Sequence, residues 1–245
     1  MKKYITAIAT TLFISATTLA QPVLSEIEDF NIGHKMAYLS IKEHIDAGKS
    51  GSGQKWDFSK LNLTSKDIEY QQIVLPADTK YAADFPKANT VEMKNDGNMV
   101  FVEKTDKQNK VWGIVRQDTK IQYTTPYVFM QRPLTFNDSI VSECSRFYDS
   151  YGGYKGTGTT KTIADGWGTL LLPSGSYTVL RVKFEQTFND ISTSNGSAMK
   201  TTVTTYAWFD ATHKGALLKS DTIVISSPYY NNAIENVSYL FTEDK

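Results

Sequence analysis

Cysteine is nearly absent from this sequence of 245 residues, in which Cys144 is the only one. No intramolecular disulfide can therefore form, even in an oxidising compartment. The residues around Cys144 offer no catalytic partner, so we interpret it as a small buried apolar side chain. A chain of this length does not need disulfides, because it buries roughly 70% of its unfolded surface on folding.

An excess of charge of either sign is also missing. The chain has 26 basic and 26 acidic residues, and loss of Lys2 and Lys3 with residues 1–20 would leave 24 against 26. Such a balance supplies no basic patch for nucleic acid. After residue 20 there is also no apolar run of the roughly 20 residues that cross a bilayer. The sequence predicts neither a nucleic-acid partner nor an integral membrane segment in the mature protein.

The first 20 residues have the order of features found in secretory signal peptides. Lys2 and Lys3 precede a short apolar stretch, and Thr18 and Ala20 place small residues where a signal peptidase reads. A membrane anchor is the competing interpretation, but the stretch is short for a span and polar sequence follows at once. We predict cleavage after Ala20 and export to the periplasm or the extracellular space.

Long stretches with the period of a helix are scarce, whereas aromatic and β-branched residues are frequent. From position 68 onward, runs rich in Val, Ile, Thr, Tyr and Phe are separated by turn residues, which is typical of strands. Residues 95–98 (Asn-Asp-Gly-Asn) and 195–196 (Asn-Gly) predict hairpin turns, because Asn and Gly accept the positive φ required there. The predicted strands are 68–75, 90–94, 99–104, 111–117, 121–130, 139–151, 159–172, 177–188, 198–211, 216–226 and 236–242.

These strands predict an all-β protein, an antiparallel meander that forms a curved sheet, a sandwich or a half-barrel. The last five runs, within residues 159–245, are long and closely spaced, so they should pair in chain order as one antiparallel sheet. Residues 21–67 show no consistent period and are expected to form a less regular N-terminal segment. No linker divides the chain, so we predict a single β-rich domain over residues 21–245.

Two strands predict which side chains share a face. In residues 177–188, apolar side chains alternate with charged ones, which predicts one buried and one wet face. The apolar face carries Leu180, Val182, Phe184 and Phe188, and the charged face carries Arg181, Lys183 and Glu185. In residues 198–211 the division is softer. One face there carries Val203, Ala207 and Phe209, and the other carries Thr202, Thr204, Tyr206 and Trp208.

The aromatic pair Tyr206 and Trp208 gives the candidate ligand-binding residues. Their alternation with threonines puts two rings about 7 Å apart along one face of a strand, within reach of one extended ligand. Exposed aromatic rings suit the apolar face of a sugar or an amphiphile. The alternative is that the N-terminal segment covers this face, and both rings would then belong to the core.

Signatures of nucleotide binding and nucleophilic catalysis are missing. Residues 48–50 (Gly-Lys-Ser) resemble the end of a phosphate-binding loop, but Glu43 stands where that loop requires glycine. No serine has the flanking glycines of a hydrolase nucleophile elbow. The histidines His34, His44 and His213 have no second ligand at a zinc spacing, so we interpret them as surface or structural residues. The sequence predicts no cofactor and no metal site.

Three carboxylates, Asp165, Glu185 and Asp210, could meet across the sheet as the acid–base pair of a glycosidase. That chemistry requires a fixed separation between two carboxyl groups, and the sequence alone does not set it. We interpret most of them as solvated charges on strands. No enzyme activity is therefore predicted.

Four phrases follow one another along the chain in a specific order: GKSGSGQKWDFSKL (48–61), ADFPKANTVEM (83–93), RPLTFNDSIVSECSRFY (132–148) and KTIADGWGTLLLPSGSYTVLRVK (161–183). Together they resemble the exported β-rich domain common in bacteria with type IX secretion, over roughly residues 45–183. The resemblance implies export and a β-rich fold, and it supplies no activity, cofactor or catalytic residue. Members often end in a separate sorting domain, whereas this sequence ends soon after its last predicted strand, so retention in the periplasm is also expected.

Three functions stay open. The leading expectation is a non-enzymatic binding or envelope-associated protein whose partner is a small molecule, a glycan or a lipid. The second is a periplasmic half-barrel carrier of an apolar ligand, such as a lipid or lipoprotein chain. The third is a glycan-active enzyme. The observation that best distinguishes these three functions is whether the folded sheet encloses a lined cavity or a filled core.

Overall fold

The structure, a computed structural model, describes residues 21–25, 31–150 and 152–243. The predicted signal peptide, residues 1–20, lies outside the described residues. Within them the chain forms strands and two short 3₁₀ helices, η1 (Pro76–Asp78) and η2 (Ala82–Asp84). The strands are β1 (Lys35–Ile41), β2 (Gly51–Asp57), β3 (Ile68–Val74), β4 (Thr90–Lys94), β5 (Met99–Lys104), β6 (Gln108–Arg116), β7 (Thr119–Gln131), β8 (Ser139–Tyr148), β9 (Tyr154–Leu172), β10 (Gly175–Ser192), β11 (Ala198–Phe209), β12 (Leu218–Ser226) and β13 (Asn231–Glu243).

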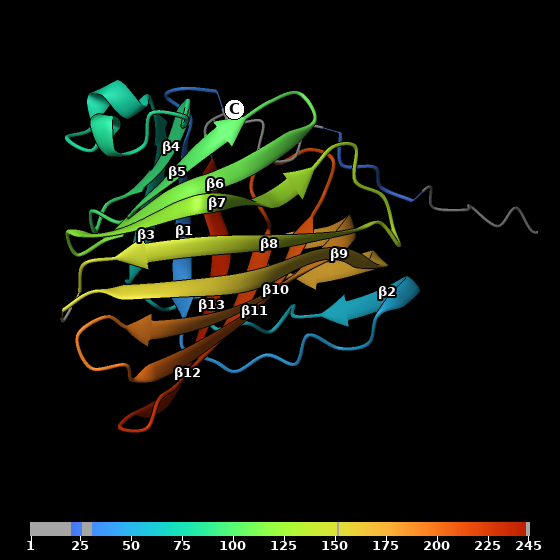
Figure 1. The fold of residues 1–245 in the computed structure, drawn as a ribbon. Coiled ribbons are helices and arrows are strands. Elements are labelled where there is room, and N and C mark those ends of the chain that lie inside the picture. Colours follow the sequence, from blue (N-terminus) through green and yellow to red (C-terminus); the bar gives the residue numbers. More distant parts are fainter. Residues whose placement is uncertain (1–20, 26–30, 151, 244–245) are drawn as a thin grey trace, which may run out of the picture.

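Twelve of these strands close into one antiparallel barrel (Figure 1). The order around the barrel is β1, β3, β4, β5, β6, β7, β8, β9, β10, β11, β12 and β13, with β13 pairing back to β1. The remaining strand, β2, lies beside the ring and pairs in parallel with the second half of β9. This is possible because β9 continues past Ile163, the last residue that pairs with β8. The part of the chain that the structure describes has no helix with the length and apolar character of a membrane span.

The predicted all-β meander is confirmed, and its sheet is closed. The last five strands pair in chain order, as their short connections predicted. The two predicted Asn-Gly type turns connect β4 to β5 and β10 to β11. Closure depends on β1, which the sequence analysis placed in the less regular segment, because β1 bridges β13 and β3. A closed sheet leaves no unpaired edge within the ring.

Contacts between strands that are not neighbours identify the barrel interior. Phe129 of β7 stacks on Phe184 of β10, with ring centroids 4.7 Å apart. Leu180 and Val182 lie on the same face of β10 as Phe184 and are fully buried. The predicted apolar face of residues 177–188 is therefore confirmed as the face toward the barrel axis. Leu24 adds to this core by a backbone bridge to Leu134, in which each N–H donates to the other carbonyl over 3.0 Å.

The opposite face of β10 is not uniformly wet, and the prediction is wrong at Arg181. This side chain is only 1% exposed, because residues 47–58 pass over it from outside the barrel. Its guanidinium binds both carboxylate oxygens of Asp165, at 2.8 and 2.9 Å, and donates to the carbonyls of Ala47 and Gly48. A buried charge requires such partners. Further along the strand this face is exposed to solvent, as predicted: Lys183 and Glu185 are partly exposed and form an ion pair.

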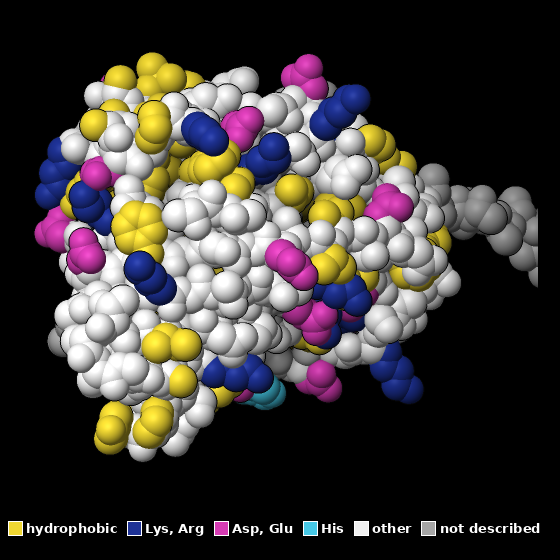
Figure 2. Space-filling view, viewed as in Figure 1, with side chains coloured by type: hydrophobic (Ala, Val, Ile, Leu, Met, Phe, Trp, Pro, Cys, Tyr) yellow, Lys and Arg dark blue, Asp and Glu magenta, His cyan; other side chains and the backbone are white. Residues whose placement is uncertain are grey.

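A second part of the outer wall is covered by the segment that contains η1 and η2. Phe85 lies directly on Gly113 of β6, where a Cβ would stand 1.8 Å from the phenyl ring. The same ring stacks on Phe101 of β5 with centroids 4.2 Å apart. The barrel thus has apolar packing on its outside as well as its inside. Elsewhere on the surface, basic and acidic side chains are interspersed on the face seen in Figure 2, in line with the balanced composition.

Candidate functional site

A pocket of about 850 Å³ opens at the barrel end where β9 turns into β10. The loop between β11 and β12, the last residues of β13 and the approach to β1 form its other walls. Because neighbouring strands run antiparallel, these connections all meet at the same end of the barrel. Apolar side chains in the lining include Leu172, Leu217, Tyr239, Leu240 and Phe241, and polar ones include Ser174, Tyr177, Thr212 and His213.

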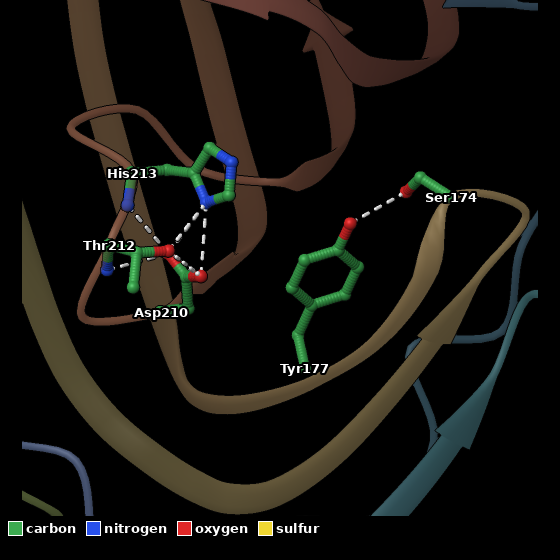
Figure 3. Close-up of polar contacts among 5 residues, drawn as sticks. All are labelled: Ser174, Tyr177, Asp210, Thr212 and His213. Carbon is green, nitrogen blue, oxygen red and sulfur yellow. Dashed lines mark hydrogen bonds and ion pairs between the residues drawn. The ribbon is translucent and has the colours of Figure 1, made fainter. Parts of the chain in front are cut away.

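Asp210 organises the loop that carries His213 (Figure 3). It follows directly after β11, and its carboxylate accepts the backbone N–H groups of Thr212 at 3.2 Å and His213 at 2.9 Å. The Thr212 hydroxyl donates to the same carboxylate over 2.6 Å. An aspartate that accepts from the backbone two and three residues ahead holds a tight turn. The turn fixes the position of the imidazole at the pocket wall.

The imidazole of His213 is also oriented by Asp210. Its Nδ1 lies 3.0 and 3.1 Å from the two carboxylate oxygens, which makes Nδ1 the donor to the carboxylate. The other ring nitrogen, Nε2, points away from Asp210 in Figure 3. His213 is partly exposed, and it lines the pocket. Nε2 is thus held ready to exchange a hydrogen bond or a proton with a bound molecule.

Two opposing effects set the charge of Asp210. Burial alone would raise the pKa of this carboxyl, but the hydrogen bonds from Thr212 and His213 outweigh it and hold the pKa below its usual range. The group is therefore a carboxylate at neutral pH.

Tyr177 and Ser174 form the facing wall of the pocket. The Tyr177 hydroxyl donates to Ser174 Oγ over 3.0 Å, and its ring lies edge-on to His213 with centroids 6.1 Å apart. Gly175, between Ser174 and Tyr177, has a φ of 147°. A side chain at Gly175 would be strained there. The β9–β10 turn thereby places two hydroxyl groups at the same opening as the imidazole of His213 (Figure 3).

The predicted ligand residues Tyr206 and Trp208 do not lie in this pocket. Trp208 is completely buried on the outer face of β11, where Trp56 and Phe58 meet it edge-on at 6.1 and 5.6 Å. The structure thus has the alternative arrangement, in which the N-terminal segment covers the face. Tyr206 is half-buried beside Arg181 and lines a separate groove of about 220 Å³.

The three carboxylates considered as a glycosidase pair each have a different partner. Asp165 binds Arg181, Glu185 binds Lys183 at 2.6 Å, and Asp210 binds His213. No described group of three or more His, Cys, Asp or Glu side chains could hold a metal ion. Each of these three carboxylates is thus held by a basic side chain, and the arrangement around Asp210 can accept and donate hydrogen bonds.

The pocket residues were missed because the sequence analysis treated each histidine as isolated. His213 stands three residues after Asp210 at the end of a predicted strand. This Asp-x-x-His spacing in a turn is the signal that could have joined them. Nothing in the sequence, however, indicates that Tyr177 and Ser174 lie opposite that turn.

The fold and pocket define a class: a closed antiparallel β-barrel with a cavity at its end, an architecture consistent with a binding or carrier protein. Comparison with known proteins adds no nearer relationship. No family model, no curated protein and no solved structure matches this chain.

Proposed function

We propose that this chain is an exported binding protein that holds a small amphiphilic molecule in the pocket at the barrel end. The observation that carries the proposal is the pocket itself, whose wall combines leucines and Tyr239 with the polar side chains of His213, Tyr177 and Ser174. Ligand sites are concave, mostly apolar, and fitted with a few fixed polar groups. The volume of about 850 Å³ lies within the ~300–1,000 Å³ typical of such sites.

The polar part of the ligand would lie against His213. Its Nε2 and the hydroxyls of Tyr177 and Ser174 supply the hydrogen-bonding groups of the pocket wall. A head group that accepts hydrogen bonds, above all a carboxylate, complements this set. The apolar part of the ligand would lie on Leu172 and Leu217.

The barrel interior suits an apolar chain less well than the end pocket does. The interior cavity measures about 200 Å³, below the usual range for a drug-sized ligand. Its lining includes the charged side chains of Glu92, Lys219 and Asp221. Burying an acyl chain against these groups would cost free energy, because they would lose water without gaining partners. If the protein carries an apolar ligand, the pocket at the barrel end is therefore the more favourable site for it.

The proposal that the protein is exported is independent of the pocket. It rests on Lys2, Lys3 and the small residues before position 21, and on the resemblance to exported domains. N-terminal sequencing of protein recovered from the producing cells should begin at Gln21. A recovered protein that starts at Met1 would contradict export by cleavage.

The binding experiment uses three probes with the same twelve-carbon chain and different heads: dodecanoate, dodecyl maltoside and dodecyltrimethylammonium. Calorimetric titration below the critical micelle concentration should give the tightest binding for dodecanoate. His213→Ala should weaken dodecanoate at least tenfold and leave dodecyltrimethylammonium unchanged. Equal affinity for all three heads would contradict the role of His213, and no binding of any probe would contradict the proposed pocket.

His44 provides a matched control. It is a second histidine paired with a carboxylate, since its Nδ1 lies 2.8 Å from Glu235, but it is well exposed and lies outside the end pocket. His44→Ala removes the same ring and leaves the pocket intact. It should bind dodecanoate as the unchanged protein does. An equal loss in both variants would point to a general charge effect.

A further inference from the structure

A second cavity lies inside the barrel, and it shares no lining residue with the end pocket. Its walls come from seven strands, β1, β3, β4, β7, β10, β11 and β12, and it has a volume of about 200 Å³. At roughly 30 Å³ per water molecule, that space holds about seven waters. A solute of similar size would fill it.

The cavity wall is divided into an apolar and a charged part. The stacked rings of Phe129 and Phe184 stand beside Ala207 and Met36. The other lining residues include the polar and charged side chains of Gln71, Glu92, Gln186, Thr205, Lys219 and Asp221. A small barrel normally fills its interior with apolar side chains. So many polar groups around an open space therefore indicate polar contents.

Three charged side chains, Glu92, Lys219 and Asp221, line the cavity, and they differ in their partners. Asp221 accepts the Thr205 hydroxyl at 2.5 Å, so this carboxylate has a partner in the wall. The side-chain carboxylate of Glu92 makes no hydrogen bond or ion pair with any residue that the structure describes. Lys219 Nζ lies 3.7 Å from the centre of the Tyr38 ring and forms no ion pair among the described residues. Besides Asp221, which already has a donor, one carboxylate and one ammonium group therefore line the same small space.

Neighbouring charges balance one another without involving Glu92. Glu69 binds Lys94 at 2.8 Å and accepts a hydrogen bond from Gln71 at 2.6 Å. Burial raises the pKa of Glu69, but Lys94, Gln71 and the more distant charge of Lys219 lower it below its usual range. The Glu69 carboxylate is thus satisfied by its own partners. Glu92 and Lys219 are half-buried, so solvent and small solutes reach them.

We propose that this interior cavity binds a small zwitterion, a free α-amino acid with an aliphatic side chain. Its ammonium group would pair with Glu92 and its carboxylate with Lys219, each as a charge-assisted hydrogen bond. Gln186 and Thr205 supply further hydrogen-bonding groups beside them. The aliphatic side chain would lie against Phe129 and Phe184. Valine, with eight non-hydrogen atoms, matches a space of about seven waters.

The test compares valine with two analogues that each lack one charged group. Isobutylamine keeps the ammonium and side chain, and 3-methylbutanoate keeps the carboxylate and side chain. Calorimetric titration of the full protein should show valine binding at least tenfold tighter than either analogue. If an analogue binds as tightly as valine, or if none of the three binds, the proposal is overturned.

Two substitutions assign the charged groups. Glu92→Gln should remove the advantage of valine over 3-methylbutanoate, and Lys219→Met should remove its advantage over isobutylamine. Glu143→Gln, on the exposed face of β8, is the matched control and should leave all three affinities unchanged. Unchanged valine binding in both cavity variants would overturn the proposal. Should a variant fail to fold, the analogue series on the unchanged protein decides the question alone.

The interior site and the end pocket make separable predictions. Valine should bind with equal affinity in the presence of saturating dodecanoate, because the two cavities have no lining residue in common. Glu92→Gln should leave dodecanoate binding unchanged, and His213→Ala should leave valine binding unchanged. Competition between valine and dodecanoate would contradict two independent sites.

Discussion

The outer face of β11 and the pocket at the barrel end use aromatic side chains in opposite ways. Trp208 is wholly buried because Trp56 and Phe58, from the N-terminal segment, lie on it. Tyr177 on the neighbouring strand is half-buried, and its hydroxyl reaches Ser174 at the pocket opening. The two strands have similar alternation. Whether an aromatic ring belongs to core or site is decided here by a covering segment more than 100 residues away in sequence.

The largest difference between the two regions should be in stability. Trp208→Ala should lower the free energy of unfolding by about 3–5 kcal/mol, the usual cost of removing a large buried side chain. Tyr177→Ala should cost only about 1–2 kcal/mol, since part of its surface is already exposed. Urea unfolding monitored by circular dichroism measures both.

Trp208→Phe is the control for that experiment. It keeps an aromatic ring beneath Trp56 and should cost less than about 1.5 kcal/mol, as expected of a conservative core exchange. If Trp208→Ala and Tyr177→Ala had equal effects, Trp208 would not be the covered residue that distinguishes the two regions.

Arg181→Met tests what fastens the covering segment. It removes the partner of Asp165 and the donor to the carbonyls of Ala47 and Gly48. Removing one member of a buried ion pair is expected to cost about 3 kcal/mol, because the remaining charge stays buried. Acrylamide quenching of tryptophan fluorescence should increase as Trp208 loses its cover. Unchanged quenching together with unchanged stability would show that the segment is held by its apolar contacts alone.

Much of the barrel was accessible from the sequence because strand periodicity is a local signal. Strands β4 and β5 occupy the predicted residues, and the meander from β9 to β13 follows from short connections. Closure of the barrel could not be predicted from the sequence. It requires β1 and β13 to pair across most of the chain length, and the sequence of β1, KMAYLSI, has four consecutive buried residues without alternation. Such a run does not distinguish a strand from other buried structure.

The site was less accessible than the fold. Asp210 and His213 are close in sequence, so their turn was open to prediction, but Tyr177 and Leu240 join them only through the strand order. Burial of Arg181 was hidden for the same reason, since its alternating pattern indicates a solvated face. The strand pattern therefore predicts local structure, whereas the contacts that depend on long-range packing are seen only in the structure.

The end pocket should respond to acid through Asp210. Its pKa is lowered in the folded protein, so the ionised carboxylate stabilises the fold above about pH 4, and that contribution is lost as the pH falls further. Asp210→Asn should lower the free energy of unfolding at pH 7 by about 1–2 kcal/mol, the scale of hydrogen bonds to a charged group. The difference between variant and unchanged protein should shrink below pH 4. A difference that grows in acid would mean that the carboxyl is protonated in the fold.

Substitution of Cys144, inside the barrel, is expected to have the smallest effect on stability. Its thiol is buried beside Phe188 and Tyr123, and burial raises its pKa to about 11. At pH 8 the thiolate that reacts with disulfide reagents is therefore scarce as well as shielded. An aromatic disulfide reagent should modify Cys144 slowly in the native protein and rapidly in urea, and Cys144→Ala should change stability by about 1 kcal/mol or less. Rapid modification of the native protein would show that solvent reaches Cys144 as readily as it reaches Glu92 and Lys219. The two halves of the barrel interior would then not differ in solvent access, as their side chains indicate that they do.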